Sequence, residues 1–125
     1  MASVLIVDDN EEVRTLLSFL LEDAGHKVSS CDDGSYVTDQ VRLHRPDVVL
    51  MDLNMPEVDG FTALENLKHD EATRDIPVIM VTASGHRHLM DKARALGATD
   101  FVVKPWRDFE VEDRVELALK NKPSS

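Results

Sequence analysis

Residues 48–56 have the sequence Val-Val-Leu-Met-Asp-Leu-Asn-Met-Pro, in which four apolar residues lead directly into one carboxylate, Asp52. An apolar run this short, β-branched at its start and preceded by Pro46 and Asp47, predicts a strand buried on both faces. Asp52 at its polar end either caps the following turn or takes part in chemistry. Aspartate opens turns so often that this stretch alone favours capping. The choice depends on whether side chains from other segments converge on Asp52.

The composition indicates one globular domain with no surface for nucleic acid. With 125 residues, 42% of them hydrophobic and 30% charged, the chain can bury a single core but not two. Fourteen Lys and Arg stand against 24 Asp and Glu, which gives a net charge of -10 with His neutral. A field of that sign repels polyanions, so we expect no direct nucleic acid binding by this domain.

The sequence also favours a cytoplasmic location. No apolar run approaches the length that spans a bilayer, and the N-terminus lacks the basic start and cleavage site of a signal peptide. We therefore expect no membrane partner. Cys31 is the only cysteine and cannot form an internal disulfide, which agrees with a reducing compartment. We expect Cys31 to be a buried or half-buried strand residue and not a nucleophile.

Apolar runs alternate with segments of helical spacing along the chain. The runs predict strands over residues 3–7, 26–31, 48–52, 77–82 and 100–104. Helical spacing of apolar residues predicts helices over residues 11–24, 35–44, 61–69, 89–96 and 109–119. This alternation predicts an α/β fold, a doubly wound five-stranded parallel sheet with helices on both faces. We expect residues 1–121 to form this domain and residues 122–125 to be a polar tail or the start of a linker.

Polar residues follow the predicted strands where each strand ends. The first strand runs into Asp8 and Asp9, and the third runs into Asp52. The fourth strand ends in Thr82 and the fifth in Lys104. The carboxyl ends of parallel strands share one edge of a sheet, and ligands bind there at the point where the strand order reverses. With the strand order 2-1-3-4-5, we expect all these side chains to converge at that edge.

Carboxylates gathered in this way predict a divalent cation. At about 5 Å and an effective dielectric near 20, each pair of carboxylates repels by roughly 3 kcal/mol, more than one lysine offsets. Oxygen ligands on an open, partly hydrated site suit Mg²⁺, which retains several waters. We expect Asp9, Asp52 and the main-chain carbonyl of Asn54 to hold Mg²⁺, and Asp8 to support it through water.

The remaining groups favour phosphoryl transfer over other chemistry. A carboxylate such as Asp52 can attack phosphorus and form an acyl phosphate. An ammonium, a hydroxyl and a metal can bind the three equatorial oxygens of the group in transfer. We therefore expect Asp52 to be the phosphoacceptor and Lys104 and Thr82 to bind phosphoryl oxygens.

The same residues resemble those of a known family, the receiver domains of bacterial two-component response regulators, and in particular the chemotaxis-type single-domain regulators. The motifs that carry the resemblance are Val-Asp-Asp-Asn at 7–10, Met-Asp-Leu-Asn-Met-Pro at 51–56, Asp59-Gly60, Pro-Val-Ile-Met-Val-Thr-Ala at 77–83, and Lys104-Pro105. Each motif alone is weak, but the ordered set is specific and extends to about Leu119. The resemblance implies a flavodoxin-like fold and a cis peptide bond between Lys104 and Pro105.

The resemblance also implies partners and a switch. Asp52 would accept phosphate from a phosphohistidine on a sensor histidine kinase or a histidine phosphotransfer protein. Phosphorylation would shift the domain between two states through Thr82 and Phe101, and Asn54 and Ser84 would tune the lifetime of the phosphate. The fourth helix, fifth strand and fifth helix would present the switched surface to a downstream protein, an output domain or a second copy. Such a domain is not an enzyme, beyond its own phosphorylation and dephosphorylation.

Three other classes of protein share parts of this pattern. A phosphatase with an aspartyl nucleophile normally has a second Asp where this chain has Asn54, and the chain has no cap domain. A flavodoxin-like FMN binder needs a loop rich in Ser, Thr and Gly after the first strand, where Asp8-Asp9-Asn10 has the wrong charge. An inert receiver-like module, which only binds partners, is disfavoured by the complete set of site residues.

Other polar and aromatic residues are expected to pack or to face solvent. We expect Trp106 to pack beside Lys104 and Pro105, where its fluorescence can report metal or phosphate. His26, His44 and His69 lie at the ends of predicted elements, where we expect solvated side chains.

Overall fold

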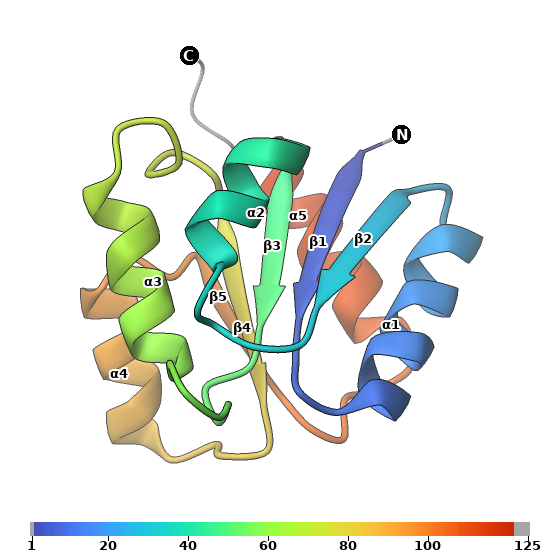
Figure 1. Ribbon diagram of the computed structural model, residues 1–125. Coiled ribbons are helices and arrows are strands. Elements are labelled where there is room, and N and C mark those ends of the chain that lie inside the picture. Colours follow the sequence, from blue (N-terminus) through green and yellow to red (C-terminus); the bar gives the residue numbers. More distant parts are fainter. Residues whose placement is uncertain (1, 122–125) are drawn as a thin grey trace.

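The computed structural model describes residues 2–121, in which five strands alternate with five helices (Figure 1). The strands are β1 (Ser3–Val7), β2 (Lys27–Cys31), β3 (Val48–Met51), β4 (Val78–Thr82) and β5 (Asp100–Val103). The helices are α1 (Glu11–Asp23), α2 (Val37–His44), α3 (Gly60–His69), α4 (Arg87–Ala95) and α5 (Glu110–Lys120). The predicted tail over residues 122–125 lies outside the described residues. None of the described helices is long and apolar enough to cross a membrane.

The predicted elements are all present, with small shifts at their ends. β3 and β5 end one residue earlier than predicted, so Asp52 and Lys104 lie just beyond the sheet. α2 starts at Val37, because residues before it form a turn in which Ser35 N donates to Asp33 Oδ1 at 2.6 Å. α5 starts at Glu110 because Phe109 has a left-handed backbone conformation with φ 66°, which no helix residue adopts.

The five strands form one parallel sheet in the order β2-β1-β3-β4-β5, as predicted. The order reverses between β1 and β3, which are direct neighbours. Val7 of β1 pairs with Met51 of β3, so the residues that follow them, Asp8 and Asp52, leave the sheet side by side. The loops after β1, β3, β4 and β5 therefore meet at one edge, at the bottom of Figure 1.

Helices cover both faces of the sheet (Figure 1). Leu5 and Val7 of β1 pack with α2, α3 and α4, whereas Val4 and Ile6 of the same strand pack with α1 and α5. This division follows from the alternation of side chains along a strand. β3 is buried along its whole length, as its continuous apolar run predicted. Each fully buried aliphatic side chain contributes about 1.5–3 kcal/mol, so the central strands form a rigid base for the loops at the edge.

His26 differs from the prediction, because its side chain is buried and not solvated. It lies at the opposite edge of the sheet, immediately before β2, where Ala2 N donates to its Nδ1 at 3.3 Å. Its Nε2 lies 3.3 Å from Glu116 Oε1 on α5. The imidazole thus joins the N-terminal segment to α5, a contact between segments far apart in sequence.

Candidate functional site

The turn after β1 fixes Asp8 at the edge of the sheet. The main-chain nitrogen of Asp8 donates to Cys31 O at 3.2 Å, which extends the pairing with β2 by one residue. Asp8 Oδ1 accepts a hydrogen bond from Asn10 N at 2.9 Å, and Asn10 Oδ1 in turn accepts one from Val13 N. Asn10 therefore caps α1. The turn and the helix cap together fix the orientation of the Asp8 carboxylate at the edge of the sheet.

Asp52 is held just as closely on the next strand. Its main-chain nitrogen donates to Val7 O at 3.0 Å, and its Oδ1 accepts from Asn54 N at 3.1 Å. α3 returns directly onto this segment, where Gly60 N donates to Leu53 O at 2.9 Å. A Cβ atom at Gly60 would lie 2.2 Å from Asp52 O, so only glycine allows this approach.

The carboxylates of Asp8, Asp9 and Asp52 form one cluster. Their nearest oxygen atoms all lie within 4.8 Å of one another. Asp8 is 2% exposed and Asp52 6%, whereas Asp9 is exposed. Lys104 Nζ donates to Asp8 Oδ2 at 2.7 Å and to Asp52 Oδ2 at 3.0 Å. One ammonium group thus bridges the two buried carboxylates and leaves Asp9 toward solvent.

Burial and hydrogen bonding shift the pKa values of Asp8 and Lys104 in this cluster, and both values are raised. Burial raises the pKa of the Asp8 carboxyl above its ordinary value, although the hydrogen bond from Lys104 opposes the shift. Burial lowers the pKa of Lys104, but its hydrogen bonds to Asp8 and Asp52 outweigh that effect and raise the pKa overall. Lys104 therefore stays charged, and the cluster holds one ammonium group against three carboxyl groups.

The donor set fits a hard divalent cation. It offers three carboxylate oxygens close together and no soft ligand within the group. Because Asp9 is exposed, a hydrated ion can reach the cluster from solvent on that side. The residues predicted to surround Mg²⁺ are therefore together in space. Asn54 is also at this edge, but which of its groups binds the ion stays a prediction.

Thr82, Ser84 and Asn54 form a second group beside the carboxylates. Thr82 is fully buried, and its Oγ1 accepts a hydrogen bond from Ser84 N at 3.3 Å. Asn54 Nδ2 donates to Ser84 Oγ at 2.9 Å and approaches Thr82 Oγ1 at 3.4 Å. The two residues predicted to tune phosphate lifetime thus contact each other across β3 and β4. The main chain of Lys104 also donates to Thr82 O at 2.9 Å, which connects this group to β5.

The residues near β5 lie where the sequence predicted. Phe101 is 6% exposed and packs in the core with α3 and α4. Its role in a switch stays a prediction, because burial in the core agrees with a packing role as well. The Lys104–Pro105 peptide bond is cis, as the resemblance implied. Trp106 is partly buried against the core that β-strands form with α1 and α5, so its packing role is confirmed.

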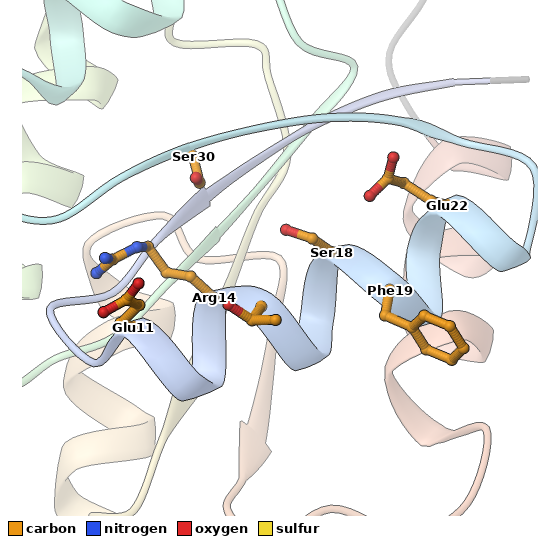
Figure 2. Close-up of a pocket in the computed structure, with 7 residues that line it drawn as sticks. Glu11, Arg14, Ser18, Phe19, Glu22 and Ser30 are labelled. Atoms are coloured by element: carbon orange, nitrogen blue, oxygen red, sulfur yellow. The ribbon is translucent and has the colours of Figure 1, made fainter.

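Arg14 contacts the site although the sequence did not single it out. Its Nη1 donates to the main-chain carbonyl of Asp8 at 2.6 Å. Figure 2 shows the Arg14 side chain next to Glu11 at the N-terminal end of α1, in a groove also lined by Ser18 and Ser30. One feature of the sequence could have indicated this contact, namely that Arg14 lies one turn after the cap Asn10. From that position a long side chain extends back toward the turn that contains Asp8.

The chain matches the family model described as response regulator receiver domain over residues 4–116. It therefore belongs to the family of response regulator receiver domains. The DNA-binding dual master transcriptional regulator RpaA of Synechocystis is 38% identical over 122 residues, which cover 96% of this chain and 50% of RpaA. The phosphate regulon transcriptional regulatory protein PhoB of Escherichia coli is 32% identical, over 94% of this chain and 51% of PhoB. The chain thus spans about half the length of these relatives.

Solved structures agree with this assignment. A putative response regulator from Chloroflexus aurantiacus has a TM-score of 0.91 at 29% identity, covering 96% of this chain and 98% of its own. The chemotaxis response regulator CheY4 of Vibrio cholerae has a TM-score of 0.88 at 30% identity, with 95% and 99% covered. The receiver domain of sensor histidine kinase PA1611 from Pseudomonas aeruginosa, solved with a magnesium ion in its active site cleft, has a TM-score of 0.88 at 25% identity, with 96% and 98% covered. The fold is therefore the flavodoxin-like receiver fold.

Proposed function

We propose that this receiver domain accepts a phosphoryl group on Asp52 from a phosphohistidine of a sensor histidine kinase or a histidine phosphotransfer protein. The observation that carries the proposal is the bridge from Lys104 to Asp8 and Asp52, with the Asp9 carboxylate in the same cluster. A carboxylate that only capped a turn would need neither a lysine nor two further carboxylates beside it. Membership of the receiver family supports the same assignment.

We propose Mg²⁺ as the cofactor, held by Asp9, Asp52 and the main-chain carbonyl of Asn54, with Asp8 acting through water. The three carboxylates and the magnesium ion in the PA1611 receiver domain support this choice. When bound, Mg²⁺ neutralises charge on the phosphoryl oxygens. Asp52 then needs no further activation, because a carboxylate is already an anionic nucleophile.

The chain's own residues account for the transfer step. A carboxylate oxygen of Asp52 forms a bond to phosphorus while the bond from phosphorus to the donor imidazole nitrogen breaks. The electron pair of that bond stays on the imidazole, which takes up a proton from water. Lys104 binds one phosphoryl oxygen, and the hydroxyl of Thr82 binds another. Lys104 already contacts Asp52, so its charge is in place before the phosphoryl group arrives.

The proposed output is a change in the surface of α4, β5 and α5. Thr82 ends β4 and Phe101 lies in the adjacent β5, so a shift of the Thr82 hydroxyl toward phosphate can be followed by Phe101. The partner is a downstream protein, an output domain or a second phosphorylated copy. RpaA and PhoB are named as transcriptional regulators and are about twice as long, which supports an output domain. We propose that the domain acts in the cytoplasm and does not itself bind nucleic acid.

Phosphorylation of the purified domain tests the proposal. The protein is incubated with Mg²⁺ and acetyl phosphate, and acid-labile phosphate is measured by intact mass, with Trp106 fluorescence in beryllofluoride as a second readout. We expect the wild type to gain one phosphate and Asp52→Asn to gain none. Asp113→Asn, which changes an exposed Asp on α5, serves as the matched control. Equal labelling of Asp52→Asn and wild type would refute the assignment of Asp52.

Asn54 and Ser84 offer a test of the tuning role. Their hydrogen bond joins the loops that follow β3 and β4, beside Thr82, so removing either side chain leaves more room for the water that hydrolyses the acyl phosphate. We expect Asn54→Ala and Ser84→Ala to change the dephosphorylation rate in the same direction, and the double variant to change it little further. Loss of phosphate is followed by mass after removal of acetyl phosphate. Unchanged lifetimes in both variants would remove this role.

A further inference from the structure

A hollow of about 350 Å³ lies between α1 and the segment that leads from β5 into α5. Both helices cover the same face of the sheet (Figure 1). Two leucines, two aromatic residues and two acidic residues line the hollow: Leu16, Leu20, Trp106, Phe109, Asp108 and Glu112. Its size is that of a small ligand site, and none of its lining residues belongs to the carboxylate cluster.

The aromatic residues of the hollow differ in how they are held. Trp106 is partly buried and packs on the core, so its position is fixed. Phe109 is 70% exposed and has a φ of 66°, a left-handed conformation that is strained for a bulky residue. Strained residues concentrate at binding sites, because function and not packing retains them. Packing alone explains Trp106, but it does not explain an exposed phenylalanine in this conformation.

The two acidic residues of the hollow have no positive partner within the part of the chain that the structure describes. Glu112 Oε1 is buried and accepts no hydrogen bond from any described residue. Among residues 2–121, neither Glu112 nor Asp108 forms a salt bridge. A buried carboxylate oxygen without a donor is unfavourable, and native structures rarely keep one without a reason. Because Glu112 lines the hollow, a donor brought by a ligand can approach its carboxylate there.

We propose that this hollow binds a guanidinium or ammonium group carried on an apolar chain. The faces of Trp106 and Phe109 attract a cation through their π electrons, and tryptophan does so best. Glu112 supplies a charged acceptor, and the leucine side chains contact the apolar chain behind the cation. The net charge of -10 raises the local concentration of cations further. An anion would be repelled here, and a purely apolar ligand would leave Glu112 without a donor.

The site does not depend on the proposed phosphorylation of Asp52, since it uses none of the same side chains. The cation can come from a free small molecule or from an Arg or Lys side chain of a partner protein. Both present the same group on the same kind of chain. Their binding differs in affinity, because a folded partner adds contacts around the hollow.

Titration with n-butylguanidinium, followed by Trp106 fluorescence and by the indole N–H signal in NMR, tests the site. The neutral compound n-butylurea has nearly the same shape and serves as the control ligand, at constant ionic strength. We expect saturable binding of n-butylguanidinium and binding of n-butylurea that is about tenfold weaker or absent. Equal binding of the two compounds, or no saturable binding of n-butylguanidinium, would overturn the proposal.

Variants locate the binding and confirm the role of charge. Glu112→Gln keeps the shape of the side chain, and we expect it to weaken n-butylguanidinium binding about tenfold. Asp108→Asn is a second variant, at an exposed position, and should weaken binding to a smaller extent. Asp113→Asn removes the same charge from α5 outside the hollow and should leave the affinity unchanged. A uniform loss in all three variants would indicate general charge attraction and overturn the site.

A peptide arm distinguishes the two sources of the cation. A helical peptide with one Arg between leucines is compared with the same peptide carrying citrulline, the neutral analogue of Arg. Arg-peptide binding tighter than n-butylguanidinium supports a partner protein, and equal or weaker binding supports a small cation. Both results retain the site. Equal binding of the Arg and citrulline peptides contradicts it.

Discussion

Replacing Asp9 by Asn should stabilise the domain without Mg²⁺ and destabilise it, relative to wild type, with Mg²⁺. The carboxylate of Asp9 lies within 4.8 Å of those of Asp8 and Asp52, but Lys104 contacts only the latter two. Asp9→Asn therefore removes one negative charge and breaks none of the hydrogen bonds of Lys104. The variant isolates the repulsion within the cluster.

The size of the effect follows from exposure. Two charges about 5 Å apart interact by roughly 3 kcal/mol at an effective dielectric of 20. Asp9 is exposed, so solvent screening and movement of its side chain reduce this to the range of surface pairs, up to about 1 kcal/mol. We therefore expect Asp9→Asn to raise the free energy of unfolding by about 1 kcal/mol in EDTA, or Tm by about 4 °C.

Mg²⁺ should reverse this order of stability between wild type and Asp9→Asn. At a concentration one hundred times its Kd, the ion stabilises the wild type by about 2.7 kcal/mol. In the Mg²⁺ site that we propose, Asp9→Asn lacks one charged ligand and gains much less, so the wild type is expected to become the more stable protein. A variant that is more stable than wild type in EDTA but less stable in Mg²⁺ reports repulsion between carboxylates. A general effect of the substitution on folding would change stability in the same direction under both conditions.

Urea unfolding followed by circular dichroism, in EDTA and in saturating MgCl₂ at equal ionic strength, measures both effects. Asp91→Asn, at an exposed position on α4, is the control and should respond to Mg²⁺ as the wild type does. The reasoning is refuted if Asp9→Asn is less stable than wild type in EDTA, or if Mg²⁺ stabilises both to the same extent.

Other positions give further predictions. Gly60→Ala places a methyl group against Asp52 O and should lower stability by about 1–3 kcal/mol in urea unfolding, whereas Gly85→Ala, whose Cβ meets only side-chain atoms, should lower it less. An equal loss in the two would contradict a specific clash. Arg14→Ala should weaken Mg²⁺ binding in calorimetry, because the acidic turn loses a charge-assisted hydrogen bond; unchanged affinity would assign Arg14 no role there. Burial and the neighbouring Asp33 and Asp32 raise the pKa of Cys31 to about 11. Iodoacetamide should therefore alkylate Cys31 roughly 100-fold more slowly at pH 8 than it alkylates an exposed thiol. The alkylation rate of Cys31 should rise about tenfold per pH unit up to that pKa. A flat pH profile would contradict the shift.

The fold and the carboxylate cluster could be predicted because both depend on local pattern and on one topological rule. The apolar run before Asp52 predicted a buried strand, and β3 is buried throughout. Once five strands alternate with helices, their carboxyl ends must share an edge, which brings Asp52 and Lys104 together across 52 positions in sequence. No contact between side chains had to be known in advance.

Features that depend on contacts between distant segments could not be predicted. His26 lies at the end of an element, where exposure is the ordinary expectation, but the N-terminal segment and α5 cover it. Phe109 has a left-handed backbone that its residue type disfavours, so no propensity indicates it. Arg14 reaches the site only through its side-chain direction on α1. In each case the determining partner is a group that sequence spacing does not reveal.

The position of Lys104 suits a site in which the charge on Asp52 changes while the contact between Lys104 and Asp8 is kept. Lys104 contacts Asp8 and Asp52 together, and its main chain donates to Thr82 O. In the function we propose, phosphorylation converts the Asp52 carboxylate into an acyl phosphate, a mixed anhydride whose phosphoryl group carries a higher charge. Lys104 can follow that charge with its hydrogen bond to Asp8 intact, whereas the buried hydroxyl of Thr82, which now accepts from Ser84 N and Asn54 Nδ2, must turn its own O–H toward phosphate. The movement is therefore expected on the Thr82 side, toward β5 and α4, with the Asp8 side fixed.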